Sequence, residues 1–140
     1  MNRVRQVIAI LLVALVPAVS AGFFHPKRPG WSKPAAENEI DLPTAVQLGS
    51  KVLWVDARPR AEFENAHIPG AVLLNEDEWE RLIDGFLDSW HRDSRVVIYC
   101  SSASCDASRG VAERLKSEAR IQNVYVLKGG WETWLASQKK

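Results

Sequence analysis

Both cysteines of the chain lie in the segment from Tyr99 to Arg109, which reads YCSSASCDASR. Cys100 follows an apolar run, and a helical pattern begins a few residues later. In α/β sheets, ligands bind at the loops that follow the carboxyl ends of the strands. The amide groups of such a loop and the positive end of the following helix help a thiol to ionise. This position predicts that Cys100 is a thiolate nucleophile.

The residues after Cys100 are small or polar, so backbone amides can approach a ligand. Asp106 stands where an N-cap is expected for a helix that starts at Ala107. A negative charge there would raise the pKa of Cys100 and oppose the effect of the amides. We expect an anion-binding loop made of Ser101, Ser102, Ala103, Ser104 and Asp106.

Other uses of the two cysteines are open at this point. The three histidines, His25, His67 and His91, are scattered and give no paired ligand spacing, so we expect no metal site and no cofactor. A disulfide between Cys100 and Cys105 would suit an oxidising compartment. It would close a short loop and stabilise the fold by about 2 kcal/mol or less. Two buried structural thiols are the remaining alternative.

The elements that must position this loop follow from the apolar pattern. Four continuous apolar runs predict strands covered on both faces, as in a parallel sheet. Helical spacing of apolar residues predicts an amphipathic helix from Trp79 to Trp90 and a second one after the cysteines. The fold class is therefore α/β, with a central parallel sheet flanked by helices. The four runs are Val52 to Val55, Val72 to Leu74, Val96 to Tyr99, and Val124 to Leu127.

The N-terminal part of the chain has a different composition. Residues 1–21 combine Arg3 and Arg5, an apolar run and small residues, which predicts a signal peptide, with an uncleaved anchor as the alternative. Residues 22–38 form a basic, proline-rich linker, and residues 39–140 form one domain. Without the two N-terminal arginines the net charge changes from +1 to −1. This charge excludes a basic nucleic-acid-binding surface.

Three motifs in this domain resemble those of the rhodanese domain, a sulfurtransferase family. Residues 55–73, VDARPRAEFENAHIPGAVL, are similar to the first signature, with an Asp-x-Arg turn followed by E-F and H-I-P-G-A. Residues 96–100 resemble the active-site strand, and residues 124–134, VYVLKGGWETW, resemble the closing strand, glycine pair and aromatic helix. The likeness covers roughly residues 39–137.

The resemblance implies a rhodanese-like fold in which Cys100 accepts sulfane sulfur as a persulfide and passes it to a thiophilic acceptor. The loop departs from the family pattern because it has no Arg or Lys beside the nucleophile, which puts thiosulfate in doubt as the donor. Cys105 is the second departure. It could act as a resolving thiol that releases sulfide and forms a disulfide with Cys100, or protect Cys100 from over-oxidation.

Asp56 and Arg58 end the first clear strand, at the predicted functional edge. They either wall the pocket or belong to an ion pair that fixes the turn, with Glu62 as the expected partner of Arg58. The expected function is sulfur transfer from a donor to a thiol acceptor; the alternatives are a non-catalytic binding or sensor module and a thiol–disulfide redox protein. We expect an exported, periplasmic monomer that touches the membrane only if residues 1–21 are retained.

Overall fold

The computed structural model describes residues 38–102 and 106–139. Every described residue belongs to one compact unit within residues 35–140. The predicted signal peptide, and the linker apart from its last residue, lie outside the described residues and stay predictions. Within the described ranges, no helix has both the length and the apolar composition needed to cross a bilayer.

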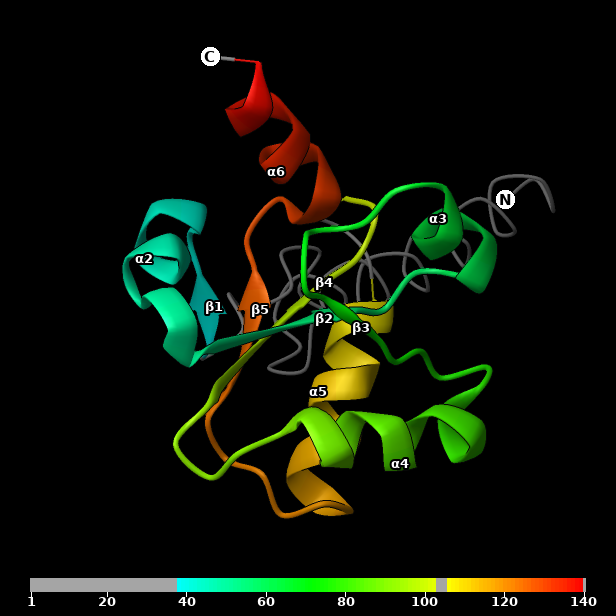
Figure 1. Cartoon of the computed structure of the whole chain (residues 1–140). Helices are drawn as coiled ribbons and strands as arrows, with labels where there is room; N and C mark the ends of the chain where they lie inside the picture. Colours follow the sequence, from blue (N-terminus) through cyan, green and yellow to red (C-terminus); the bar gives the residue numbers. More distant parts are fainter. Residues whose placement is uncertain (1–37, 103–105, 140) are drawn as a thin grey trace, which may run out of the picture. The chain divides into compact units, whose positions relative to one another are not determined.

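Five strands form one parallel sheet in the order β1-β5-β4-β2-β3 (Figure 1). The strands are β1 Glu39–Ile40, β2 Val52–Asp56, β3 Val72–Leu73, β4 Arg95–Tyr99 and β5 Val124–Leu127. The helices are α2 Leu42–Gln47, η1 Gly49–Lys51, α3 Arg60–Asn65, α4 Trp79–Ser89, α5 Ala107–Ser117 and α6 Gly130–Gln138. The predicted α/β class and all four predicted strands are confirmed.

The central strand β4 is apolar after its first residue, Arg95, because helices cover both faces of the sheet. Its residues from Val96 to Tyr99 are all fully buried. Val96 and Ile98 point to one face, where they pack with residues of α4 and α5. Val97 and Tyr99 point to the other face, which α2 and α6 cover. We call these the α4–α5 face and the α2–α6 face.

The two long helices of the α4–α5 face occur where helical spacing predicts them. Helix α4 buries Trp79 and Phe86 against the sheet. Helix α5 starts at Ala107, as expected, and its buried side chains follow one stripe. The Arg114 guanidinium lies 4.2 Å from the centre of the Trp79 ring, which links the two helices at their outer surface. The buried side chains of α5 are Ser108, Val111, Ala112 and Leu115.

Four short elements were not predicted from the sequence: β1, α2, η1 and α3. Each has six residues or fewer, too few for an apolar period to show. Helix α2 instead depends on local capping, since the Asp41 side chain accepts a hydrogen bond of 2.8 Å from the Thr44 amide. A local cap therefore stabilises α2, whereas α3 and η1 have no capping hydrogen bond from a side chain.

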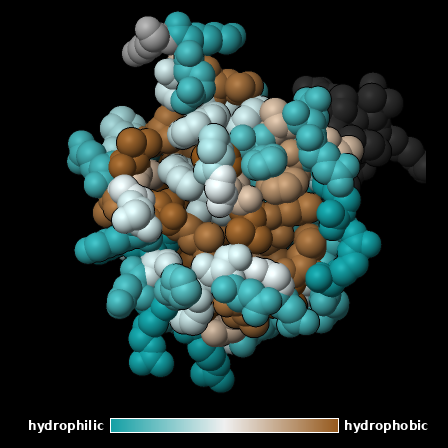
Figure 2. Space-filling model, in the orientation of Figure 1, coloured by the Kyte–Doolittle hydropathy of each residue, from teal (hydrophilic) through white to brown (hydrophobic). Residues whose placement is uncertain are grey.

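Large apolar side chains that remain exposed are dispersed over three helices. They are Val46 in α2, Leu87 in α4 and Leu135 in α6. Figure 2 shows hydrophilic side chains around the margins of one face of the molecule, with apolar residues between them. Singly exposed apolar side chains are normal in soluble domains and need no ligand to explain them.

Candidate active site

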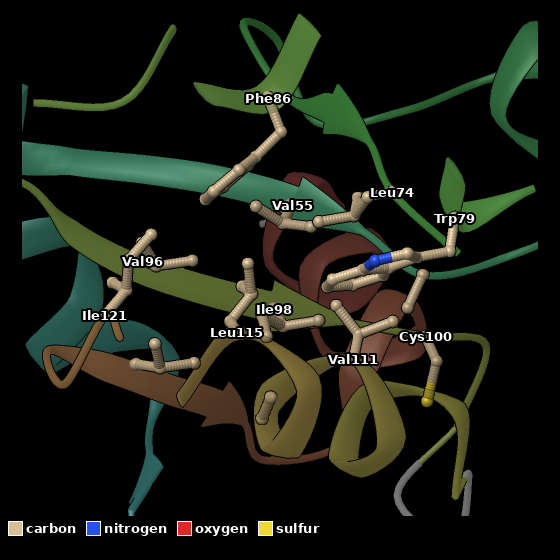
Figure 3. Packing of buried hydrophobic residues seen from close by; sticks show 13 residues of the cluster. Val55, Leu74, Trp79, Phe86, Val96, Ile98, Cys100, Val111, Leu115 and Ile121 are labelled. Carbon is tan, nitrogen blue, oxygen red and sulfur yellow. The ribbon is translucent and has the colours of Figure 1, made fainter. Parts of the chain in front are cut away.

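Cys100 lies immediately after β4, at the carboxyl end of the central strand. Its side chain belongs to the apolar cluster of the α4–α5 face and is 2% exposed. Figure 3 shows it beside Val111 and Trp79, with the sulfur at the outer end of the cluster. The structure has Cys100 in a disulfide-bonded form. Cys105 lies outside the described residues, so its predicted role as a resolving thiol stays a prediction.

Ser108 is a site residue whose contact with the sulfur was not predicted. Its hydroxyl lies 3.5 Å from Cys100 Sγ, and its side chain is 1% exposed. The carbonyl oxygen of Ser102 lies 3.4 Å from the same sulfur. When Cys100 is reduced and ionised, the Ser108 hydroxyl can donate to the thiolate and stabilise it. Ser108 could have been identified from the sequence as a hydroxyl residue within the apolar stripe of the helix that follows the cysteines.

Of the predicted anion-binding loop, the structure describes Ser101, Ser102 and Asp106, whereas Ala103 and Ser104 lie outside the described residues. The Ser101 hydroxyl donates to Glu62 Oε2 at 3.2 Å. Asp106 precedes α5, but its side chain makes no capping hydrogen bond. It instead lies 3.4 Å from Arg109 Nη1. Asp106 is therefore the N-cap residue of α5, as expected, but its side chain does not accept hydrogen bonds from the helix amides.

The start of α6 supports the loop from the α2–α6 face. The Trp131 amide donates a 2.7 Å hydrogen bond to the carbonyl oxygen of Cys100. Gly129 and Gly130 have φ of 80° and 55°, in the left-handed region that glycine adopts readily. A Cβ at Gly130 would overlap the Cys100 carbonyl oxygen. The close approach of these two segments therefore requires glycine at position 130.

Asp56 and Arg58 form a buried ion pair on the α2–α6 face, at the same edge of the sheet. Their side chains are 0% and 4% exposed. Arg58 Nη2 lies 2.6 Å from Asp56 Oδ2, and the Arg58 amide donates to Asp56 Oδ1 at 2.9 Å. Glu62 Oε2 lies 3.5 Å from Arg58 Nη1, so the expected contact with Glu62 exists but is secondary. Asp56 pairs in register with Tyr99, one residue before Cys100.

Aromatic rings enclose this ion pair. The Arg58 guanidinium lies 4.4 Å from the Trp131 ring centre and 5.6 Å from that of Tyr99. Burial would lower the pKa of Arg58, but the hydrogen bonds and charge of Asp56 raise it overall, so Arg58 stays protonated. Burial also raises the pKa of Tyr99, whose hydroxyl accepts a 3.1 Å hydrogen bond from the Ile68 amide. The tyrosine is therefore neutral and structural.

Two surface cavities lie next to these elements. One of about 320 Å³ is lined by residues 76–81 and Arg114, and the other, of about 230 Å³, lies over α5 and β5. Cys100 is not among the residues that line either cavity. Across residues 38–102 and 106–139, no group of three His, Cys, Asp or Glu side chains is placed to hold a metal ion.

Comparisons with known proteins agree with this geometry. The family model for the rhodanese-like domain matches residues 42–137. The thiosulfate sulfurtransferase GlpE of Glaesserella parasuis is 30% identical over 84 residues, which are 60% of this chain and 71% of that protein. A solved rhodanese-like domain from Anabaena sp. is 23% identical, with a TM-score of 0.57 over 72% of this chain and 75% of that one. A thiosulfate sulfurtransferase structure from Pseudomonas aeruginosa is 24% identical, with a TM-score of 0.53 over 72% of this chain and 18% of that one.

Proposed function

Because this chain belongs to the rhodanese-like domain family, we propose that it is a sulfurtransferase that carries sulfane sulfur on Cys100. One observation carries the proposal: Cys100 lies at the carboxyl end of the central parallel strand, with its sulfur 3.5 Å from the Ser108 hydroxyl. A hydroxyl at this distance stabilises the thiolate, and the thiolate is the form that attacks a sulfur donor.

The proposed reaction has two balanced steps once a dithiol reductant has opened the disulfide. The Cys100 thiolate attacks the sulfane sulfur of the donor, a new S–S bond forms, and the donor's bond to that sulfur breaks as the leaving group takes the electron pair. A thiolate of the acceptor then attacks the outer sulfur of the Cys100 persulfide. The sulfur moves to the acceptor, and Cys100 returns to its thiolate form.

Two groups next to Cys100, one in α5 and one in α6, would assist this chemistry. The Ser108 hydroxyl would donate to the sulfur of Cys100 in the thiolate that forms before loading and again after transfer. The hydrogen bond from the Trp131 amide fixes the Cys100 carbonyl, and so the backbone from which the side chain projects. These contacts hold the sulfur in position with little motion required of the protein.

Intact mass spectrometry of the reduced protein tests this proposal. Incubation with thiosulfate or with a small-molecule persulfide should add the mass of one sulfur atom, and a thiol acceptor should remove it. The Cys100→Ser variant should gain nothing, whereas Cys105→Ser should still gain one sulfur. If no donor adds sulfur to the folded, reduced protein, the sulfurtransferase function is excluded, and a thiol–disulfide redox protein or a non-catalytic binding module remains.

A second candidate is thiol–disulfide redox chemistry, which the disulfide-bonded form of Cys100 favours. In that case a substrate dithiol would reduce the disulfide and leave as a disulfide itself, with no sulfur atom transferred. The two candidates give different masses after one turnover. The redox protein would differ by two hydrogens, and the sulfurtransferase by one sulfur.

The cellular location is also a proposal. The charged and apolar segments of residues 1–21 support export to the periplasm, with the domain tethered by residues 22–38 when the segment is retained. The mass of the protein recovered from a periplasmic fraction distinguishes the two forms. Recovery of the whole chain in the cytoplasm alone would contradict export.

A further inference from the structure

We propose that Glu62 sets the substrate charge preference of this site, so that Cys100 exchanges sulfur with cationic or neutral partners in preference to anions such as thiosulfate. The inference depends on the proposed sulfurtransferase function, which it extends to a class of substrate. It arises from a carboxylate that the structure places beside the loop, on a helix that the sequence did not predict.

Glu62 is fixed next to the residue that follows the nucleophile. It lies in α3, and its Oε2 accepts a 3.2 Å hydrogen bond from the Ser101 hydroxyl. The same oxygen lies 3.5 Å from Arg58 Nη1, so the carboxylate is held from two sides. Its side chain is 47% exposed, and a solute that approaches the loop would therefore meet its charge.

Arg58 does not cancel this charge, because it is already engaged by Asp56. It makes hydrogen bonds of 2.6 to 3.2 Å with both carboxylate oxygens of Asp56 and one of 2.7 Å with the Ala66 carbonyl. Asp56, Arg58 and Glu62 together carry a net charge of −1. The exposed member of the trio is the carboxylate of Glu62, whereas the guanidinium is 4% exposed.

At the other end of the loop, the charged groups that the structure describes also sum to −1. Arg109 lies 3.4 Å from Asp106 and 3.2 Å from Glu39, so this cation contacts two carboxylates. The Asp106 side chain is 71% exposed. Among the described residues, both flanks of the Cys100 loop therefore present more negative than positive charge.

Other charged groups at this edge do not reverse the balance. Lys128 follows β5 and lies near Asp41, whose carboxyl pKa it helps to lower. The Glu76 carboxylate lies against Gly110 in α5, and Asp77 follows it. Among the residues that the structure describes, an anion at the loop would find amides and hydroxyls to offset these carboxylates, whereas a cation would be attracted to them.

The test compares donors that differ in charge. The persulfides of cysteamine, 2-mercaptoethanol and 3-mercaptopropionate carry cationic, neutral and anionic tails on similar carbon chains, and thiosulfate adds a dianion. Rates of sulfur loading on reduced protein, followed by quenched intact mass, should fall in that order. Glu62→Gln keeps an oxygen acceptor for Ser101 but removes the charge. It should speed loading from thiosulfate roughly fivefold, slow the cationic donor, and leave the neutral donor within about twofold.

Glu64→Gln is the matched control, because Glu64 lies on the same helix and contacts only Arg60 among the ion pairs of the described residues. The Glu64→Gln variant should leave the order of loading rates among the four donors unchanged. Raising the salt concentration should reduce the differences between donors in the parent protein. Equal effects of Glu62→Gln on all four donors, or no effect on any, would overturn the inference while sulfur loading itself still supports the proposed function. Failure of every donor in every variant would overturn the proposed function instead.

Discussion

The two faces of the sheet meet at the same strand end but are built from different chemistry. On the α4–α5 face, Cys100 packs among apolar side chains, and the Ser108 hydroxyl contacts its sulfur. On the α2–α6 face, one residue earlier, Tyr99 packs beside the buried pair of Asp56 and Arg58. The last residue of β4, Tyr99, therefore lies beside a fixed ion pair on one side of the sheet, and the next residue, Cys100, places the reactive sulfur on the other side.

This difference shows how charge can support a site without contacting its reactive atom. The guanidinium of Arg58 neutralises Asp56 and orders the turn that carries Glu62 to the loop. Among the described residues, the neighbours of the Cys100 sulfur are apolar groups, a hydroxyl and a backbone carbonyl. We infer that the ionic face holds the loop in place and the apolar face determines the reactivity of the thiol.

The largest expected effect comes from breaking the buried ion pair. Arg58→Met leaves the Asp56 charge buried without its partner, which should lower the free energy of unfolding by about 3 to 5 kcal/mol. The double variant Asp56→Asn with Arg58→Met removes that charge and should recover much of the loss. Urea unfolding followed by circular dichroism measures both.

The control for this change is Arg81→Met, which removes an ion pair from an arginine that is 67% exposed. A surface pair of this kind contributes about 1 kcal/mol or less. If Arg58→Met were no more destabilising than Arg81→Met, the ion pair would not be the element that holds the α2–α6 side of the site.

An intermediate effect is expected on the other face, from Ser108→Ala. Loss of the hydroxyl should raise the pKa of the reduced Cys100 thiol by about one unit, because a hydrogen bond to the thiolate is lost. The pH dependence of the alkylation rate of Cys100 measures this pKa. Ser117→Ala on the same helix is the control, since that hydroxyl bonds to the Glu113 carbonyl. If Ser108→Ala left the pH dependence of the alkylation rate unchanged, this hydroxyl would not contribute to the reactivity of the sulfur.

The smallest effect concerns the cap of α2. Hydrogen bonds from Thr44 hold the pKa of Asp41 below its ordinary value of 3.8, so the ionised form favours the folded state. This contribution is present above the unfolded-state pKa and is lost as the pH falls through the lower folded-state value. Asp41→Asn should therefore make the melting temperature less dependent on pH below about pH 4. Identical pH profiles for the two proteins would contradict this linkage.

The long elements and the nucleophile could be predicted from the sequence because their signals are local. Continuous apolar runs mark β4 and β5, and a stripe of helical spacing marks α4. The position of Cys100 at a strand end follows from the run that precedes it. The contact of Ser108 with the sulfur depends on how α5 packs against β4, which spacing along the chain does not specify.

The charged surroundings of the loop could not be predicted for a similar reason. Glu62 and Ser101 are 39 positions apart, and the helix that carries Glu62 is too short to show a period. The sequence suggested Glu62 as an ion-pair partner of Arg58, whereas in the structure the buried Asp56 is the principal partner. Pairings between distant charged residues depend on the packed fold, so the sequence left them open.

One measurement tests the central claim most directly. Reduced protein loaded with sulfur, freed of donor and mixed with a thiol acceptor should lose one sulfur atom per molecule as the acceptor gains one. Mass spectrometry of both partners, with fragmentation to locate the sulfur, should place it on Cys100 before transfer. Two results would contradict the account. One is the release of free sulfide as a protein disulfide forms, and the other is sulfur carried by the Cys100→Ser variant.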